Sequence, residues 1–305
     1  MDGRALAARI REDLKGEIAG FGDVRLATVL VGDDPASQIY IRLKHKAAEE
    51  VGIQALDKRL PQDTPEEEVL ELVEELNDDE SVDGILVQTP LPPQIDEARV
   101  MRTLDPMKDV DGLHPYNAGQ LFFGRQTLVG ATPVGVMRLL AEYDIPVVGA
   151  RAVVVGRSLI VGRPLSMLLL HANATVTICH SKTRDLADVV RRADIVVAAM
   201  GRAGYVKADW LKPNSAVIDV GTNTVKDPKE AQQLLANFPE RLEKFNAKGS
   251  VLVGDVHPDA VNTAGALTPV PGGVGPMTIT MLMSNTVKAA RMRRGTPATS
   301  TSARG

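Results

Sequence analysis

The sequence predicts an α/β protein with largely parallel sheets, divided into two domains. Short apolar runs alternate with helical patterns along the chain, as in sheets whose strands are joined by crossover helices. The runs are continuous rather than alternating, which is typical of strands that helices cover on both faces. With 305 residues, 44% of them hydrophobic, the chain is long enough to bury two ordinary cores.

The strands are predicted from apolar, mostly β-branched runs. In chain order they are residues 26–31, 84–87, 152–155, 174–178, 194–199 and 216–220. A first helix is expected over 36–51, with a buried stripe at four-residue spacing formed by Ile39, Leu43, Ala47 and Val51. A second is expected over 64–77, where Thr64 and Glu67 form a capping box around Pro65 at the first helical position.

The domain boundary is predicted near residue 130, where Thr132 and Pro133 follow a polar loop and start a helix. The first domain then covers 1–130 and the second 131–268. Residues 268–278 hold three prolines and three glycines, which exclude a helix or a central strand. A last helix over 276–295 is expected to return to the first domain. The small polar tail 296–305 is expected to be disordered, and 227–248 to be a helical surface insertion.

Composition excludes several classes of protein. A net charge of −4 argues against an electrostatic nucleic-acid binder. No apolar run approaches the ~18 residues that span a membrane, and the N-terminus carries acids where a signal peptide would be apolar. The single cysteine, Cys179, excludes an intramolecular disulfide and lies in an apolar run, which predicts a buried small residue. The expected location is the cytoplasm.

The glycine turn after the strand at 152–155 is a candidate cofactor site. Gly156 allows a ligand to approach closely, and Gly162 permits tight packing where the next helix begins. The strand at 174–178 is followed by Ser181 and Lys182 rather than by the acid that binds a ribose 2′-hydroxyl. Together with Arg157 these groups favour NADP over NAD. The alternative is an ordinary turn with two solvated cations.

The first domain offers several polar candidates. Tyr40 and Lys44 are four residues apart at the border of the expected stripe, where a lysine is either partly desolvated or merely extended toward solvent. Gln88 ends a buried strand at the edge where such sheets place ligands. Asp109 and Asp111 lie in a loop that lacks the other oxygen ligands of a calcium site, and His114 has no second histidine at metal spacing, so no metal is expected.

Several stretches together resemble the bifunctional methylenetetrahydrofolate dehydrogenase/methenyltetrahydrofolate cyclohydrolases. They include "VGDDPASQIYIRLKHKAAEEVGI", "GILVQTPLP", "KDVDGLHPYNAG", "VVVGRSLIVGRPLSMLL", "TVTICHSKT", "VIDVGTN" and "TPVPGGVGPMT", and they span nearly the whole chain. The resemblance implies an N-terminal catalytic domain, a Rossmann-like NADP-binding domain and a cleft between them. It also implies a homodimer that acts on tetrahydrofolate derivatives in one-carbon metabolism.

The resemblance assigns roles to individual residues. It implies that Lys44 is catalytic, with Tyr40 and Gln88 around it, and that Asp111 binds the pterin ring. The segment with Pro271, Gly272 and Gly273 is placed near the folate. The remaining residues contact NADP: Gly156, Arg157 and Ser158 at the pyrophosphate and ribose, Ser181 at the 2′-phosphate, and Thr222 at the nicotinamide.

The chain departs from the family pattern at three places. Thr89 stands where leucine is common, "GATP" stands where "PCTP" is common, and the segment 227–248 is longer than usual. None of these departures removes a catalytic group. Two other hypotheses remain open from the residues: a different NADP-dependent dehydrogenase of small metabolites, and a non-catalytic NADP sensor.

Overall fold

The computed structural model describes residues 1–294, so the prediction for the tail 296–305 lies outside the described residues. The chain forms two compact units. We call Ala8–Ala131 with the chain from Ile279 the N-terminal unit, and Met1–Ala7 with Thr132–Thr278 the central unit. The sequence pattern did not anticipate the grouping of the first seven residues. They join the central unit through the Met1 ammonium, which donates to Leu267 O at 2.7 Å, and Gly3 N, which donates to Gly272 O at 3.0 Å.

The N-terminal unit is built on a three-stranded parallel sheet of order β2-β1-β3. Its strands are β1 (Val24–Val31), β2 (Ile53–Leu60) and β3 (Gly84–Val87). Its helices are α2 (Pro35–Val51), α3 (Glu66–Asp78), α4 (Glu97–Thr103) and α5 (Pro115–Phe122), together with most of α1 (Gly3–Phe21) and α11 (Val274–Arg294). Buried side chains of α3 and α4 pack on β1 and β3 to form the core. The edge strand β2 was not predicted from the sequence. Charged residues occupy most of its exposed positions, so it contains no continuous apolar run.

The predicted stripe on α2 is wrong for half of its members. Ile39 and Leu43 are 48% and 45% exposed, whereas Ile41 and Ala48 are fully buried. Ala47 and Val51 are buried as predicted. With 3.6 residues per turn, more than one row of apolar residues fits the helical spacing, and packing on the sheet selects the row that is buried.

The predicted capping box of α3 is also wrong. The helix begins at Glu66, one residue later than expected, and Pro65 has extended ψ and occupies the cap position. Thr64 is therefore too far from the first turn to accept its N–H groups. Glu66 instead accepts a hydrogen bond from Asp96 N at 2.5 Å and pairs with Arg99, which ties the start of α3 to α4.

The central unit contains a five-stranded parallel sheet of order β10-β7-β6-β4-β5. Its strands are β4 (Arg151–Val155), β5 (Thr175–Cys179), β6 (Ile195–Ala198), β7 (Ala216–Asp219) and β10 (Ala266–Leu267). The predicted strands are confirmed to within one or two residues. Helices α6 (Ala131–Glu142), α7 (Gly162–His171) and α8 (Leu186–Val190) accompany them. Because β4 pairs with β5 on one side and with β6 on the other, the strand order reverses at β4, the position at which such sheets bind ligands.

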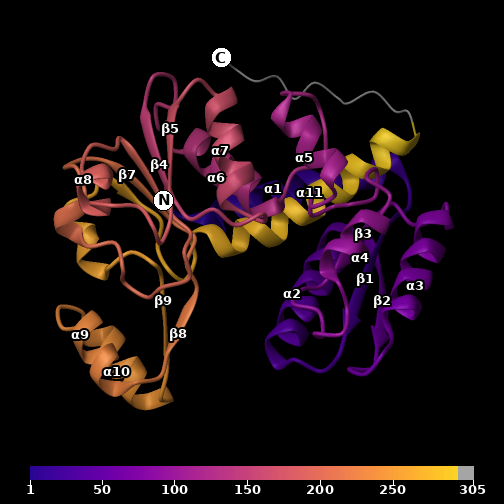
Figure 1. Cartoon of the computed structure of the whole chain (residues 1–305), viewed down its shortest axis with the longest axis horizontal. Helices are drawn as coiled ribbons and strands as arrows, with labels where there is room; N and C mark the ends of the chain where they lie inside the picture. Colours follow the sequence, from indigo (N-terminus) through magenta and orange to yellow (C-terminus); the bar gives the residue numbers. More distant parts are fainter. Residues whose placement is uncertain (295–305) are drawn as a thin grey trace. The chain divides into compact units, whose positions relative to one another are not determined.

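The insertion predicted at 227–248 is helical. It connects the two strands of an antiparallel ribbon, β8 (Asn223–Val225) and β9 (Val251–Val253), and consists of α9 (Pro228–Leu234) and α10 (Pro239–Lys248). Figure 1 shows both helices at the far end of this ribbon. They share a small core that includes Leu234, Leu235 and Phe245, so the insertion is a folded element. Within residues 1–294, no helix is long and apolar enough to cross a membrane.

Candidate active site and cofactor loop

Lys44 and Gln88 meet at the carboxyl edge of the N-terminal sheet. Gln88 directly follows β3, and its backbone N–H donates to Val29 O at 2.9 Å. Lys44, on α2, is half-buried, and its Nζ donates a hydrogen bond to Gln88 Oε1 at 2.9 Å. The other end of the amide is held as well, because Gln88 Nε2 donates to Thr89 O at 2.7 Å. The amide oxygen is therefore directed at the lysine.

The charges of Lys44 and Asp111 influence each other. Burial lowers the pKa of Lys44, and the Asp111 carboxylate opposes this shift. Burial likewise raises the pKa of Asp111, with Lys44 opposing and Asp109 reinforcing the rise. Since desolvation dominates at both groups, the neutral amine is more accessible here than on an exposed lysine. This position suits an amine that both accepts and returns a proton.

The polar residues of the loop 108–112 have different roles. Lys108 is buried, and its Nζ donates to the carbonyls of Leu76, Asn77 and Asp79 at 2.9, 2.6 and 2.8 Å. It thereby satisfies carbonyl groups at the end of α3. Asp109 is also buried and accepts from His114 N at 2.7 Å and from Asn117 Nδ2 at 3.0 Å. Of the two acids in "KDVDG", Asp111 is therefore the one available to a ligand.

Gly112 explains the sharp turn after Asp111. Its φ is +63°, and a Cβ at this position would lie 2.8 Å from Val129 Cα. Only glycine combines that dihedral angle with so close a backbone approach. His114 is the N-cap of α5, where its Nδ1 accepts from Tyr116 N at 3.0 Å. The His114 side chain therefore stabilises the start of α5.

Tyr40 lies one turn before Lys44 on α2. The side chain is 46% exposed, and within residues 1–294 its hydroxyl makes no hydrogen bond to Lys44. Ile39 and Leu43 are exposed beside it. The exposed ring is suited to stacking on a flat ligand, and its assigned role stays a prediction.

The glycine turn of the central unit has the close packing that a phosphate-binding loop requires. Gly156 has φ +141°, and a Cβ there would lie 2.1 Å from Ala199 O, while a Cβ on Gly162 would lie 2.3 Å from Gly156 O. Ser158 Oγ accepts from Val161 N and Gly162 N at 3.2 and 3.3 Å, which folds the loop back onto the start of α7. This arrangement places backbone amides beside a helix N-terminus.

The loop after β5 lies beside this turn, because Gly156 N donates to Cys179 O at 2.9 Å. His180 N donates to Thr183 Oγ1 at 2.8 Å, which shapes residues 180–183 into a tight turn. Ser181, Lys182 and Arg157 are all exposed at this edge. Hydroxyl and cationic groups thus lie at the ends of two adjacent strands. Cys179 is buried, as predicted, and burial raises the pKa of its thiol.

Sequence reasoning missed two buried acids that shape the neighbouring loops. Asp255 is fully buried, and its carboxylate accepts from Met200 N, Gly201 N and Arg202 N at 2.6, 2.9 and 2.8 Å. It also accepts from Asn223 Nδ2 at 2.8 Å. Asp255 therefore joins the loop after β6 to the segment after Thr222, which is itself exposed. The apolar segment "VGDV", in which Asp255 stands between glycine and valine, was the available sequence signal for a buried acid.

Asp219 is the second of these acids. Its carboxylate accepts from Gly221 N and Asp255 N at 3.0 and 2.8 Å and from Val256 N at 3.0 Å. Burial raises the pKa of Asp219 to about 7, while these backbone N–H groups oppose the rise. A Cβ on Gly254 would lie 1.8 Å from Asp219 Oδ2, so the two acidic segments are packed without spare room.

Residues 271–273 form a tight backbone turn inside the central unit. Gly272 has φ +114°, and Gly273 N donates to Pro269 O at 2.8 Å. The turn contacts the start of α1, since a Cβ on Gly3 would lie 1.8 Å from Gly273 O. The folate contact assigned to Pro271, Gly272 and Gly273 stays a prediction. Residues 1–294 contain no group of three or more His, Cys, Asp or Glu side chains arranged to hold a metal ion.

The Gly156→Ala variant is expected to raise the Kd for NADP+ by about tenfold or more, because the added methyl group must displace Ala199 O or the loop itself. Isothermal titration with NADP+ measures the effect. The control is Gly149→Ala, at φ +74° with open space around the new methyl group. An unchanged Kd in Gly156→Ala, with the same fold, would show that the turn does not hold the dinucleotide.

Two family models match the chain. Residues 1–111 match "Tetrahydrofolate dehydrogenase/cyclohydrolase, catalytic domain", and residues 130–294 match "Tetrahydrofolate dehydrogenase/cyclohydrolase, NAD(P)-binding domain". Among curated proteins, the bifunctional protein FolD of Koribacter versatilis is 51% identical over 299 residues, covering 97% of each chain. The FolD protein of Methanospirillum hungatei is 50% identical, covering 97% of this chain and 98% of its own.

Solved structures show the same similarity. The FolD methylenetetrahydrofolate dehydrogenase/cyclohydrolase of Campylobacter jejuni is 43% identical with a TM-score of 0.86, covering 96% of this chain and 98% of its own. The Trypanosoma brucei methylenetetrahydrofolate dehydrogenase-cyclohydrolase, complexed with NADP and an inhibitor, is 40% identical with a TM-score of 0.86, covering 98% of both chains.

Proposed function

The chain belongs to the tetrahydrofolate dehydrogenase/cyclohydrolase family, and from this premise we propose that it catalyses both reactions that the family name describes. The first is NADP-dependent oxidation of 5,10-methylenetetrahydrofolate to 5,10-methenyltetrahydrofolate. The second is hydrolysis of the methenyl form to 10-formyltetrahydrofolate. The observation that carries the proposal is the Lys44–Gln88 hydrogen bond of 2.9 Å within the field of Asp111.

The oxidation needs orientation more than a base. Hydride leaves the carbon between N5 and N10, and the nitrogen lone pairs stabilise the resulting cation. NADP+, when bound, supplies the hydride acceptor. Asp111 anchors the pterin by accepting parallel hydrogen bonds from its ring amide and amino group. Such fixed geometry contributes on the order of 7–11 kcal/mol to the lowering of a barrier.

The hydrolysis needs proton transfer, which we assign to Lys44. As the water oxygen attacks the methenyl carbon, the neutral amine takes a proton from that water. Gln88 Oε1 accepts a hydrogen bond from the resulting ammonium, and the Asp111 charge stabilises it. When the bond from the former methenyl carbon to N5 breaks, the ammonium returns a proton to N5, and the remaining hydroxyl proton passes to solvent as the formyl C=O forms. The formyl group remains on N10, and Lys44 is again neutral.

The exposed groups after β4 and β5 support NADP as the cofactor. Arg157 and Lys182 carry positive charge and Ser181 a hydroxyl, and no acid ends β5. An acid there would bind the ribose 2′-hydroxyl of NAD and repel a 2′-phosphate. We therefore expect a higher kcat/KM with NADP+ than with NAD+, and a Ser181→Asp variant that reverses part of this preference.

A spectrophotometric assay tests the proposal. Purified protein with methylenetetrahydrofolate and NADP+ should produce the methenyl absorbance, and added methenyltetrahydrofolate should lose it by hydrolysis. A different NADP-dependent dehydrogenase would show neither signal but would oxidise another substrate. A sensor would bind NADP+ without turnover. Absence of both signals from folded, NADP-binding protein would refute the proposal.

The pH profile of the hydrolysis should reflect Lys44. The base is the neutral amine, so kcat should rise with pH and level off above the lowered pKa of Lys44. Because desolvation favours the neutral form, this plateau should begin at a lower pH than the ordinary lysine pKa would give. The measurement is kcat at saturating methenyltetrahydrofolate from pH 6 to 9, corrected for the uncatalysed hydrolysis. A flat profile would argue against Lys44 as the base.

We further propose a cytoplasmic homodimer that binds neither nucleic acid nor membranes. The assembly rests on the family resemblance, and light scattering coupled to gel filtration measures it. The location is supported by the buried lone thiol of Cys179, which suits a reducing compartment. A monomeric mass in active protein would refute the dimer.

A further inference from the structure

The α9–α10 insertion forms one wall of a cavity in the central unit. The cavity has a volume of about 520 Å³ and is lined by α10, β9, the 3₁₀ turn at Pro258–Asn262 and residues 267–271, with Asp219 at the end of β7. Pockets for small molecules typically fall between about 300 and 1,000 Å³. None of the dinucleotide-loop residues from 156 to 162 lines it. It is therefore a separate cavity.

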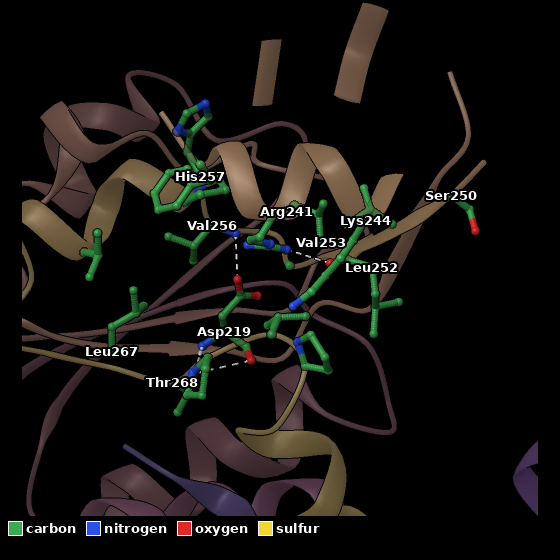
Figure 2. Close-up of a pocket in the computed structure, with 18 of the residues that line it drawn as sticks. Asp219, Arg241, Lys244, Ser250, Leu252, Val253, Val256, His257, Leu267 and Thr268 are labelled. Carbon is green, nitrogen blue, oxygen red and sulfur yellow. Dashed lines mark hydrogen bonds between the residues drawn. The ribbon is translucent and has the colours of Figure 1, made fainter. Parts of the chain in front are cut away.

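The α10 wall is positively charged. Arg241, Lys244 and Lys248 follow one another at steps of three and four residues, so they share one face of the helix, and all three line the cavity. Figure 2 shows the side chains of Arg241 and Lys244 extending from α10 in the direction of Asp219. Among the described residues, none of the three cations has an ion-pair partner within 4.0 Å.

Arg241 is the most constrained of these cations. Its Nη2 donates to Leu252 O at 2.7 Å, which fixes the guanidinium against β9 (Figure 2). Burial lowers the pKa of Arg241, and no carboxylate opposes the shift. A partly buried cation without a paired anion is energetically costly, and a bound anion would remove that cost.

The other walls favour a ligand with an apolar part. They comprise Phe238 at the N-cap of α10, Leu252 and Val253 on β9, Val256, and Leu267. Asp219 is the one acid among the lining residues, and its two oxygens are already bonded to the backbone N–H groups of Gly221, Asp255 and Val256. These bonds hold the carboxylate in place, and among the described residues it forms no ion pair within 4.0 Å with an α10 cation.

We propose that this cavity binds a small ligand in which a carboxylate or phosphate is attached to a compact apolar body. The anionic group contacts Arg241, Lys244 and Lys248, and the apolar body lies against β9 and Val256. A carboxylate is a planar acceptor and a phosphate a tripodal one, and guanidinium and ammonium groups bind both well. The three cations alone therefore do not show which of the two anions is bound. The site includes none of the dinucleotide-loop residues 156–162, and it shares only Pro271 with the segment assigned to the folate.

Titration calorimetry on the full chain saturated with NADP+ tests this inference, because the dinucleotide loop is then occupied. The probes are phenyl phosphate, phenylacetate and inorganic phosphate. We expect saturable binding of phenyl phosphate or phenylacetate, and the tighter of the two identifies the anionic class. Inorganic phosphate should bind at least about tenfold more weakly than phenyl phosphate, because it lacks the apolar body.

Variants of α10 locate the site. Lys244→Gln and Lys248→Gln should each raise the Kd of the preferred aromatic probe by about tenfold, since each removes a charge-assisted contact. Lys229→Gln, on the exposed side of α9, is the matched control and should leave the Kd unchanged. NADP+ affinity and thermal stability should be unaffected in all three.

Three results would overturn the inference: no saturable binding by NADP+-loaded protein, equal binding of inorganic phosphate and phenyl phosphate, or an unchanged Kd in both Lys244→Gln and Lys248→Gln.

Discussion

Replacement of Lys44 by methionine should reduce the cyclohydrolase rate by about 10²–10⁴, the contribution of a positioned general base. Methionine keeps an unbranched chain in the half-buried position but has no proton acceptor, and Gln88 loses its partner at 2.9 Å. The dehydrogenase step should fall much less, because hydride departure needs no strong base. The two rates are measured separately, by decay of methenyltetrahydrofolate and by its formation with NADP+.

The matched control is Lys46→Met, two residues away on the exposed side of the same helix. Lys46→Met changes the net charge and the composition of α2 by the same amount as Lys44→Met. It should leave both rates near those of the parent enzyme. Substrate binding, measured by titration with methenyltetrahydrofolate, should persist in Lys44→Met. Hydrolysis at the parent rate by Lys44→Met would remove Lys44 from the mechanism. A parallel fall of both activities would assign it to substrate orientation instead.

Replacement of Asp111 by asparagine should raise the KM for methylenetetrahydrofolate by about 10²-fold. The amide keeps one acceptor oxygen but presents an NH₂ group to a donor of the pterin, so one charge-assisted hydrogen bond becomes a donor–donor contact. The Kd for NADP+ should not change. Steady-state kinetics with each substrate varied in turn distinguishes the two effects.

Asp109→Asn provides the contrast, because Asp109 is buried and bonded to His114 N and Asn117 Nδ2. Its replacement should lower the melting temperature, since the two hydrogen bonds that Asp109 Oδ2 accepts are no longer charge-assisted. Asp111→Asn, at a half-buried position, should change KM far more than stability. A normal folate KM in Asp111→Asn would refute the pterin contact.

Much of the fold was predictable from local patterns. Continuous apolar runs located β1, β3, β4, β6 and β7, because strands buried on both faces need apolar residues at every position. An apolar run also located β5, although this edge strand is largely exposed. The edge strand β2 carries "QALDKR", which satisfies neither that pattern nor strict alternation, and only its pairing with β1 identifies it. The α2 stripe failed for a related reason, since several rows of its apolar residues match the helical period.

Part of the candidate site was also predictable from the sequence, and part was not. Lys44 and Gln88 were identifiable from residue type and position, and the structure brings them to 2.9 Å. The loop "KDVDG" shows two acids and a lysine with no local difference between them. Only their tertiary contacts separate Lys108 and Asp109, which satisfy buried backbone groups, from Asp111 beside Lys44.

The sequence by itself determined the α/β class, the position of the glycine turn and the residue types available for chemistry, since each depends on near neighbours along the chain. Tertiary structure decided which face of α2 is buried, which acid of "KDVDG" interacts electrostatically with Lys44, and how Asp219 and Asp255 bind distant loops. Those outcomes depend on desolvation and hydrogen bonding between segments far apart in the chain, and no local pattern encodes them; Met200 and Asp255, for example, are separated by 55 residues.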